Sequence, residues 1–256
     1  MITVNGIVKM FDSETVLDHL SLEVPRGELF AILGPNGCGK TTLLKCLAGL
    51  YVPIEGTITI DGLDRRRDHL AIRRFVSWLP DQPFLYTNFT GEGWLKMVAS
   101  FYEIDEPKSR KQIGELLDIF DLKSLGSKRI THYSNGQYKK LAICGALITN
   151  ARLYIFDEPF TGEIDPPGVA ALKEILRAMA KRDDITCVFS TQMVDQAEQL
   201  AERVGVLHNG RFAAVGTAAE LRERYDARSL EEVLTTICNK RPSETTKSFL
   251  ETLARF

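Results

Sequence analysis

Short apolar runs bounded by polar turns recur toward both ends of the chain, and this pattern is typical of buried β-strands. A turn at Asn209-Gly210 separates the last such run from residues 211–215, which predicts a β-hairpin. Between the two halves the pattern changes to the spacing of amphipathic helices. The predicted strands are 2–8, 29–33, 57–60, 75–79, 153–156, 186–190 and 204–207, and the predicted central helices are 94–102, 109–120 and 137–149.

This order of elements divides the chain into three predicted parts. Residues 1–82 and 153–220 would form one α/β core, and residues 83–152 a helical insert. Helix-like segments follow at 218–225 and 229–237. Residues 221–256 would form a C-terminal helical extension, in which the stretch KRPSETTKS predicts a break before a last short helix.

Composition limits the function only loosely. The chain has 256 residues, a net charge of −2 and five cysteines without a Cys-x-x-Cys pair, so we expect no zinc site and no disulfide framework. The cysteines favour a reducing, cytoplasmic setting, and the charge gives no sign of nucleic-acid binding. No 18-residue apolar run exists, so we do not expect the chain to cross a membrane.

The stretch LGPNGCGKTT carries the strongest chemical signal. It fits the phosphate-loop pattern G-x-x-x-x-G-K-[ST] and lies between a predicted strand, LFAIL, and a predicted helix, LLKCLAGL. Glycines let the backbone N–H groups turn toward a phosphate, and the helix N-terminus adds a favourable dipole. Lys40 suits the β- and γ-phosphates of a nucleotide, and the hydroxyl of Thr41 suits Mg²⁺. The predicted nucleotide-binding residues here are Gly34, Pro35, Asn36, Gly37, Cys38, Gly39, Lys40, Thr41 and Thr42.

A second acidic site follows the apolar run LYIF. Asp157 and Glu158 are adjacent, and adjacent residues of a strand point to opposite sides. We therefore expect different roles: one of them can hold Mg²⁺ through its waters, while the other orients or activates a water molecule.

Together these motifs resemble the ATP-binding subunit of ABC transporters over about 215 residues. Residues 34–42 resemble the Walker A motif, and residues 153–158 resemble Walker B with the catalytic glutamate. The run Ser134-Asn135-Gly136-Gln137 resembles the signature motif, and TGEIDP resembles the D-loop. The resemblance implies an ABC ATPase fold: a phosphate-loop core with a parallel sheet, an N-terminal antiparallel β part and a helical subdomain.

The resemblance also implies how the site works. ATP and Mg²⁺ would bind the phosphate loop of one subunit, with adenine on Phe11, the Mg²⁺ at Asp157 and Glu158 as the catalytic glutamate. The signature motif of a second ATPase subunit, identical or different, would cover the nucleotide in a head-to-tail dimer. Ser134, Gly136 and Gln137 would contact the nucleotide there, at a helix N-terminus.

Three positions depart from the family pattern. Asn135 replaces a glycine, and we expect it to keep a left-handed backbone because Asn tolerates it best among the other residues. In the Q-loop, Asp81 aligns with the usual glutamine and Gln82 follows it, so either could meet Mg²⁺; we assign the role to Gln82. Gln192 replaces the histidine of the switch strand. As a catalytic residue it could donate a hydrogen bond to the γ-phosphate or the attacking water, but unlike histidine it cannot take up a proton and become positively charged.

A transporter also needs a membrane permease, which this chain does not supply. The resemblance implies a groove for the permease beside the Q-loop, where Phe84 and Tyr86 would line it and Trp94 would pack inside the protein. The subunit would then lie at the inner face of the cell membrane. Its C-terminal segment resembles exporter subunits.

Two alternatives to a transport ATPase stay open. One is a regulatory module that binds nucleotide with little hydrolysis, and the other is a soluble ABC-family ATPase.

Overall fold

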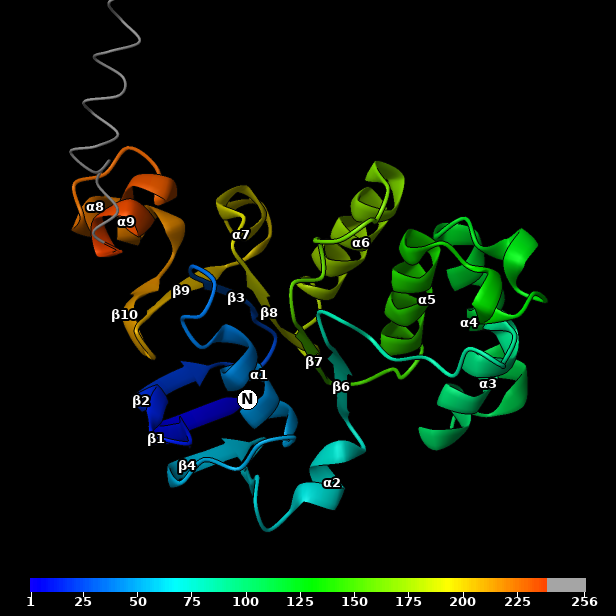
Figure 1. Ribbon diagram of the computed structural model, residues 1–256, viewed down its shortest axis with the longest axis horizontal. Coiled ribbons are helices and arrows are strands. Elements are labelled where there is room, and N and C mark those ends of the chain that lie inside the picture. Colours follow the sequence, from blue (N-terminus) through cyan, green and yellow to red (C-terminus); the bar gives the residue numbers. More distant parts are fainter. Residues whose placement is uncertain (239–256) are drawn as a thin grey trace, which may run out of the picture.

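The computed structural model describes residues 1–238, and a six-stranded sheet forms its centre (Figure 1). Its strand order is β10-β9-β3-β8-β7-β6, in which β9, β3, β8, β7 and β6 run parallel and β10 pairs antiparallel with β9. The bounds are β3 Leu29–Leu33, β6 Val76–Leu79, β7 Leu153–Phe156, β8 Thr186–Thr191, β9 Arg203–His208 and β10 Arg211–Gly216. All the corresponding predicted runs are strands, and the predicted hairpin at Asn209-Gly210 is present.

A second, antiparallel sheet is built mostly from the N-terminal part of the chain. Its order is β2-β1-β4-β5, with bounds β1 Ile2–Phe11, β2 Glu14–Val24, β4 Glu55–Ile60 and β5 Leu63–Asp64. The strand β2 is absent from the predicted strands. It alternates buried and solvent-facing residues, as expected of a sheet with one face on the core.

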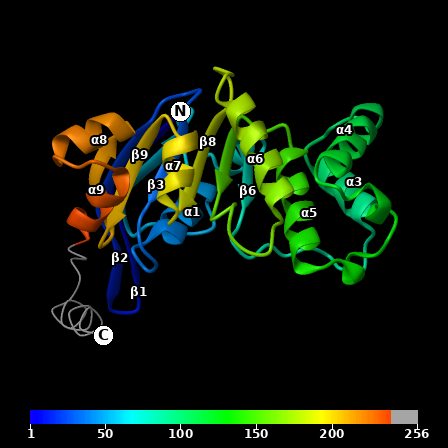
Figure 2. The same ribbon diagram turned by 90° about the horizontal axis from the view of Figure 1, so that it is seen from above.

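Two hydrophobic cores lie on the two faces of the central sheet. In β3, Phe30 and Ile32 belong to one core, and the alternate residues Leu29, Ala31 and Leu33 belong to the other. The helix α1 (Lys40–Ala48) fills the first core, between the central sheet and the antiparallel sheet. The helices α6 (Pro166–Met179) and α7 (Val194–Leu200) cover the opposite face (Figure 2).

The helices α3 (Gly91–Phe101), α4 (Glu106–Ile119) and α5 (Asn135–Leu147) gather at one end of the molecule (Figures 1 and 2). Each begins at a side chain that caps it, namely Thr90, Asp105 and Ser134. Trp94 of α3 lies so close to Gly145 of α5 that a Cβ atom there would be 2.2 Å from its ring. Trp94 therefore packs between helices, as predicted.

The remaining elements are short. They are α2 (His69–Arg73), two 3₁₀ turns (Lys123–Leu125 and Ile130–His132), α8 (Ala218–Arg224) and α9 (Leu230–Ile237). The predicted break and last helix of the C-terminal extension lie outside the described residues. Within residues 1–238, no helix combines the length and the apolar character needed to cross a membrane. The α/β architecture with an antiparallel β part and a group of helices is the one predicted.

Candidate functional site

The loop between β3 and α1 has a backbone that glycine alone can follow easily. Gly37 and Gly39 have φ angles of 78° and 108°, in the region that other residues rarely adopt. A Cβ atom on Gly34 would lie 2.5 Å from the carbonyl oxygen of Leu207 in the neighbouring strand β9. The glycines of the motif thus shape a tight turn that ends directly at the N-terminus of α1.

Lys40, the first residue of α1, holds its ammonium group inside this loop. Its Nζ atom donates hydrogen bonds to the carbonyl oxygens of Gly34, at 2.8 Å, and Pro35, at 3.2 Å. The same atom lies 3.4 Å from Oε1 of Glu158. Only 6% of Lys40 is exposed, so the charge is compensated within the protein.

Glu158 comes from the end of β7 by a route that the sequence did not predict. The strand ends at Phe156, so Asp157 and Glu158 lie beyond it and strand alternation does not separate them. Instead Glu158 has a φ of 46°, a left-handed conformation that turns its side chain toward Lys40. Backbone strain of this kind is concentrated at functional sites.

Ser190 of the neighbouring strand β8 fixes this turn. Its hydroxyl donates to Oδ1 of Asp157 at 2.6 Å and accepts the backbone N–H of Glu158 at 2.9 Å. The contact follows from the parallel register: because Phe156 pairs with Phe189, the residues that follow them, Asp157 and Ser190, lie side by side. Sequence reasoning missed Ser190, although pairing β7 with β8 in register would have pointed to it.

Burial raises the pKa of the Glu158 carboxyl above its usual value, while Lys40 acts in the opposite direction. Glu158 is 8% exposed, and apart from the contact with Lys40 its carboxylate oxygens have no close hydrogen-bond partner among the described side chains. The carboxylate can therefore accept a proton or a hydrogen bond from a water molecule in the adjoining cavity, as a general base does.

These groups face one cavity of about 430 Å³. The predicted site residues that line it are Asn36, Gly37, Gly39, Lys40, Thr41, Thr42, Glu158 and Gln192. It is also lined by Val16, Asp81 and Thr161, which the site prediction did not include. Among the described residues, the predicted site residues outside the lining are Phe11, Gly34, Pro35, Cys38, Gln82, Ser134, Gly136, Gln137 and Asp157.

Asp81 rather than Gln82 is the Q-loop residue at the cavity. Its Oδ1 accepts a hydrogen bond from Thr161 at 3.4 Å, and its backbone oxygen accepts one from Nζ of Lys139. Lys139, on α5, is 6% exposed and lies 3.8 Å from Oδ1 of Asp81. Burial lowers the pKa of Lys139, whereas the nearby carboxylates, Asp81 first, raise it. The preference for Gln82 therefore finds no support in the geometry.

The signature residues form the start of α5. Ser134 caps the helix: its hydroxyl accepts the N–H of Gln137 at 3.3 Å, and Gln137 Oε1 accepts the N–H of Ser134 at 2.9 Å. A Cβ atom on Gly136 would lie 2.2 Å from the carbonyl oxygen of Glu163, so this position needs glycine.

The expectation of a left-handed Asn135 was wrong. Asn135 is the first residue of α5, with a helical backbone, and its amide donates to the Glu163 carboxylate at 3.0 Å. A glycine is not required there, which explains why asparagine fits.

Of Phe11 and Gln192, only Gln192 lines the cavity. Phe11 ends β1, is 39% exposed and packs edge-on against Tyr51 with ring centroids 5.3 Å apart. Gln192 follows β8 and is exposed at the cavity. Both lie at a surface that a ligand can reach.

Comparison with known proteins agrees with this geometry. Residues 17–161 match the family model described as ABC transporter. The daunorubicin resistance ATP-binding protein DrrA3 of Streptomyces coeruleorubidus is 35% identical over 91% of this chain and 73% of its own length. A sulfate/thiosulfate import ATP-binding protein, CysA of Synechocystis, is 33% identical over 87% of this chain and 62% of its own.

A solved structure resembles most of this arrangement. It is a dimeric post-hydrolysis state of the ATP-binding cassette MJ0796 bound to ADP and Pi, with a TM-score of 0.77 and 25% identity. The similarity covers 85% of this chain and 98% of that one. The motifs, the fold and these relatives lead to one conclusion: this chain belongs to the ABC transporter family, as one of its ATP-binding, ATP-hydrolysing subunits.

Proposed function

We propose that two copies of this chain close head to tail on ATP and Mg²⁺, and that hydrolysis drives transport through a separate membrane permease. The observation that carries the proposal is the Lys40–Glu158 pair, buried side by side at the phosphate loop. A cation for the phosphates and a base for the water molecule stand at one cavity, which is what phosphoryl transfer to water requires.

In this proposal each residue at the cavity has one task. The N–H groups of the loop and the ammonium of Lys40 hold the β- and γ-phosphates, which displace Lys40 from the loop carbonyls. Glu158 orients the attacking water and accepts its proton, and Gln192 donates a hydrogen bond at the γ-phosphate. Positioning and charge supply most of the catalysis in such reactions.

The donors present suit magnesium. The Thr41 hydroxyl and the Asp81 carboxylate both face the cavity, and Asp157 lies beside Glu158, bound to Ser190. Hard oxygen ligands of this kind, completed by phosphate oxygens and water, are those that Mg²⁺ prefers. When bound, the ion would neutralise charge on the phosphates. We assign Asp81 in place of Gln82, because Lys139 offsets the negative charge that an aspartate adds.

The second subunit would complete the site. Ser134, Gly136 and Gln137 do not line the cavity of their own chain, so a partner's α5 is the source that we propose. The Ser134 hydroxyl has its proton available for an acceptor while it caps the helix. The relative with ADP and Pi is a dimer, which supports this assembly.

The permease would dock beside the Q-loop. A groove of about 340 Å³ runs between β6 and α5, and Phe84 and Trp94 are among its lining residues. Phe84 is 82% exposed, and Tyr86 packs edge-on against it with centroids 5.9 Å apart. Exposed aromatic side chains at a groove are typical of interfaces. The chain would thus lie peripherally at the inner face of the cell membrane.

The direction of transport that we propose is export. The C-terminal segment resembles exporter subunits, and the daunorubicin resistance relative is matched over more of both chains than the sulfate importer. A transport assay in inverted vesicles, with the permease co-expressed, tests this: uptake into the vesicles is expected, and net release would contradict export.

Replacing Glu158 by glutamine should separate binding from hydrolysis. The amide keeps the shape but removes the base, so we expect kcat to fall by about 100- to 10,000-fold. ATP affinity should stay equal or increase, because a negative charge leaves the phosphate site. Phosphate release and fluorescent-ATP titration measure the two quantities. Lys40→Ala is the control and should lose tight ATP binding; normal turnover in both variants would refute the assigned roles.

Asp81 and Gln82 provide a matched pair for the Q-loop. Because only Asp81 lines the cavity, Asp81→Ala should raise the Mg²⁺ concentration needed for half-maximal hydrolysis, and Gln82→Ala should leave it unchanged. The measurement is ATPase rate against Mg²⁺ concentration. The opposite order of effects would return the role to Gln82.

Tyr86→Asp should uncouple hydrolysis from transport. The added charge disrupts an apolar contact at the groove, whereas the nucleotide cavity, which Tyr86 does not line, stays intact. Basal ATPase should be retained and transport lost when both are measured in proteoliposomes with the permease. Ile119→Asp, at an exposed side chain of α4 outside this groove and outside the cavity beside it, serves as the control. Transport that survives in Tyr86→Asp places the permease contact elsewhere.

A further inference from the structure

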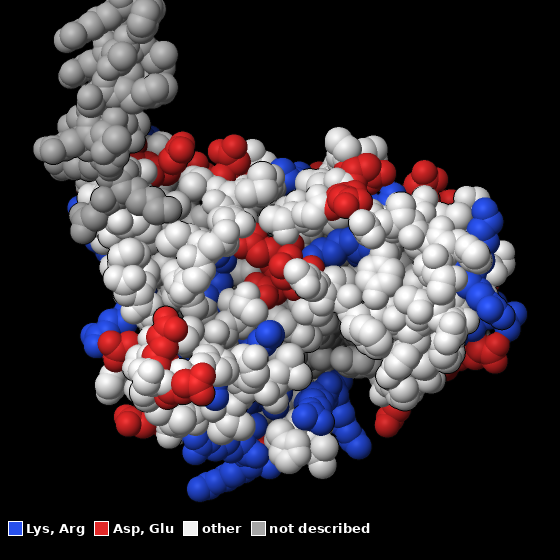
Figure 3. All heavy atoms as spheres, viewed as in Figure 1, with Lys and Arg blue, Asp and Glu red and all other residues white. Residues whose placement is uncertain are grey.

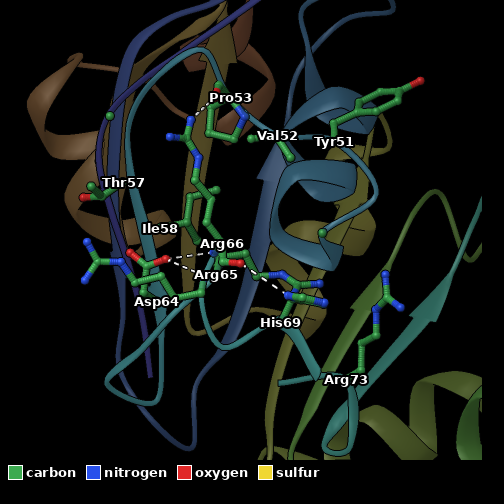
Figure 4. Close-up of a pocket in the computed structure, with 13 residues that line it drawn as sticks. Tyr51, Val52, Pro53, Thr57, Ile58, Asp64, Arg65, Arg66, His69 and Arg73 are labelled. Atoms are coloured by element: carbon green, nitrogen blue, oxygen red, sulfur yellow. Dashed lines mark hydrogen bonds between the residues drawn. The ribbon is translucent and has the colours of Figure 1, made fainter. Parts of the chain in front are cut away.

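A second cavity lies away from the nucleotide cavity, between the end of α1, the β4–β5 region and α2 (Figure 4). It measures about 470 Å³, and its lining includes Arg65, Arg66, Arg67 and Arg73 with a single carboxylate, that of Asp64. Figure 3 shows basic side chains gathered along the lower edge of the molecule, where Figure 1 places β4 and α2. The near-neutral overall charge of the chain conceals this local excess.

Arg65 forms the floor of this basic pocket. It is 7% exposed, and its Nε and Nη2 atoms donate to the carbonyl oxygens of Leu47 and Ala48 at the end of α1. Its Nη1 atom is buried and has no hydrogen-bond partner among the described residues. A buried donor without an acceptor is costly, and an anion in the pocket would satisfy it.

One carboxylate, that of Asp64, acts on Arg66 and Arg67 electrostatically, and it does not balance the charge of four arginines. Within residues 1–238, no carboxylate lies within ion-pair distance of Arg65, Arg66, Arg67 or Arg73. Burial, and secondly the positive charge of Arg73, lower the pKa of Arg65, as expected for like charges held together. Arginine forks match phosphate oxygens in geometry and charge.

Exposed apolar side chains lie close in sequence to the residues of this pocket, and one of them, Val52, lines it. Leu50, Val52 and Ile54, on the segment that leads from α1 to β4, are each more than half exposed, and Leu70 of α2 is 67% exposed. Exposed aliphatic residues beside arginines are typical of surfaces that rest on an anionic membrane, where the chains enter the interface and the charges meet lipid phosphates.

The pocket also continues toward the groove proposed for the permease. Arg73 lines both the pocket and an adjoining cavity of about 370 Å³, whose other side is formed by Trp78 and Tyr102. Trp78 and Tyr102 in turn line the aromatic groove. Since a permease is embedded in the bilayer, this continuous face would be turned toward the membrane.

We propose that the basic pocket binds the phosphate group of an anionic phospholipid, so that the face carrying α2 contacts the bilayer surface. The inference rests on the proposed permease docking for the orientation of this face. The site itself rests on the arginines and their unsatisfied donor. Such a contact would hold the subunit against the membrane independently of nucleotide.

Vesicle co-sedimentation of the full chain tests the proposal. Wild-type protein should bind vesicles containing phosphatidylglycerol and not those of phosphatidylcholine alone. The double variant Arg67→Gln, Arg73→Gln removes two charges whose side chains make no hydrogen bond within the described chain. Its affinity for these vesicles should be about 30-fold lower, because each basic residue at an anionic surface contributes about one kcal/mol of binding free energy.

The control removes the same charge elsewhere: Lys111→Gln with Lys123→Gln, both exposed near α4. It should bind like wild type, and an equal loss would mean non-specific attraction and overturn the proposal. Equal binding to both kinds of vesicle would also overturn it. Arginine-dependent binding of glycerol 3-phosphate without vesicle binding would assign the pocket to a soluble phosphate and refute the lipid. The ATPase rate of the arginine variant should equal wild type, which separates failure here from failure of the proposed function.

Discussion

The burial of one ammonium group, that of Lys40, is the constraint on which the rest of the site depends. A buried cation must be compensated, and here the loop carbonyls and the Glu158 carboxylate do so. This requires the loop after β3 to meet the end of β7. The sheet order β3-β8-β7 brings the two together, with Ser190 of β8 between them as a spacer that fixes the turn at Glu158.

Charge balance also connects the helical end of the molecule to the nucleotide cavity. Lys139 on α5 reaches Asp81 at the cavity, and the same helix begins at Ser134, the residue proposed to close a partner's site. A shift of α5 that follows nucleotide binding would therefore alter both places together. Phe84, shortly after Asp81 in the chain, lines the aromatic groove, so the same movement would reach the groove proposed for the permease.

Much of this was predictable from the sequence because apolar strands and glycine-rich turns are local signals. The strands β3 and β7 and the phosphate loop are where the pattern places them. The features that were missed or wrongly predicted depend on contacts between parts of the chain that are far apart in sequence. Ser190 reaches Asp157 only because β7 and β8 pair in register. Asp81 is accommodated because Lys139, on another element, lies beside it. Glu158 faces Lys40 because its own backbone is left-handed after the end of the strand. The basic pocket combines residues 49–73, but its depth and its unpaired donor arise only from folding.

The central claim is that the cavity is incomplete until Ser134 of a second copy closes it over ATP. Sedimentation velocity of the Glu158→Gln variant with Mg²⁺ and ATP tests this most directly, because bound ATP then persists. The account predicts a dimer with ATP, monomers with ADP, and monomers in both when Ser134→Arg is added. A Glu158→Gln protein that binds ATP yet stays monomeric, or a Ser134→Arg protein that still dimerises, would contradict it.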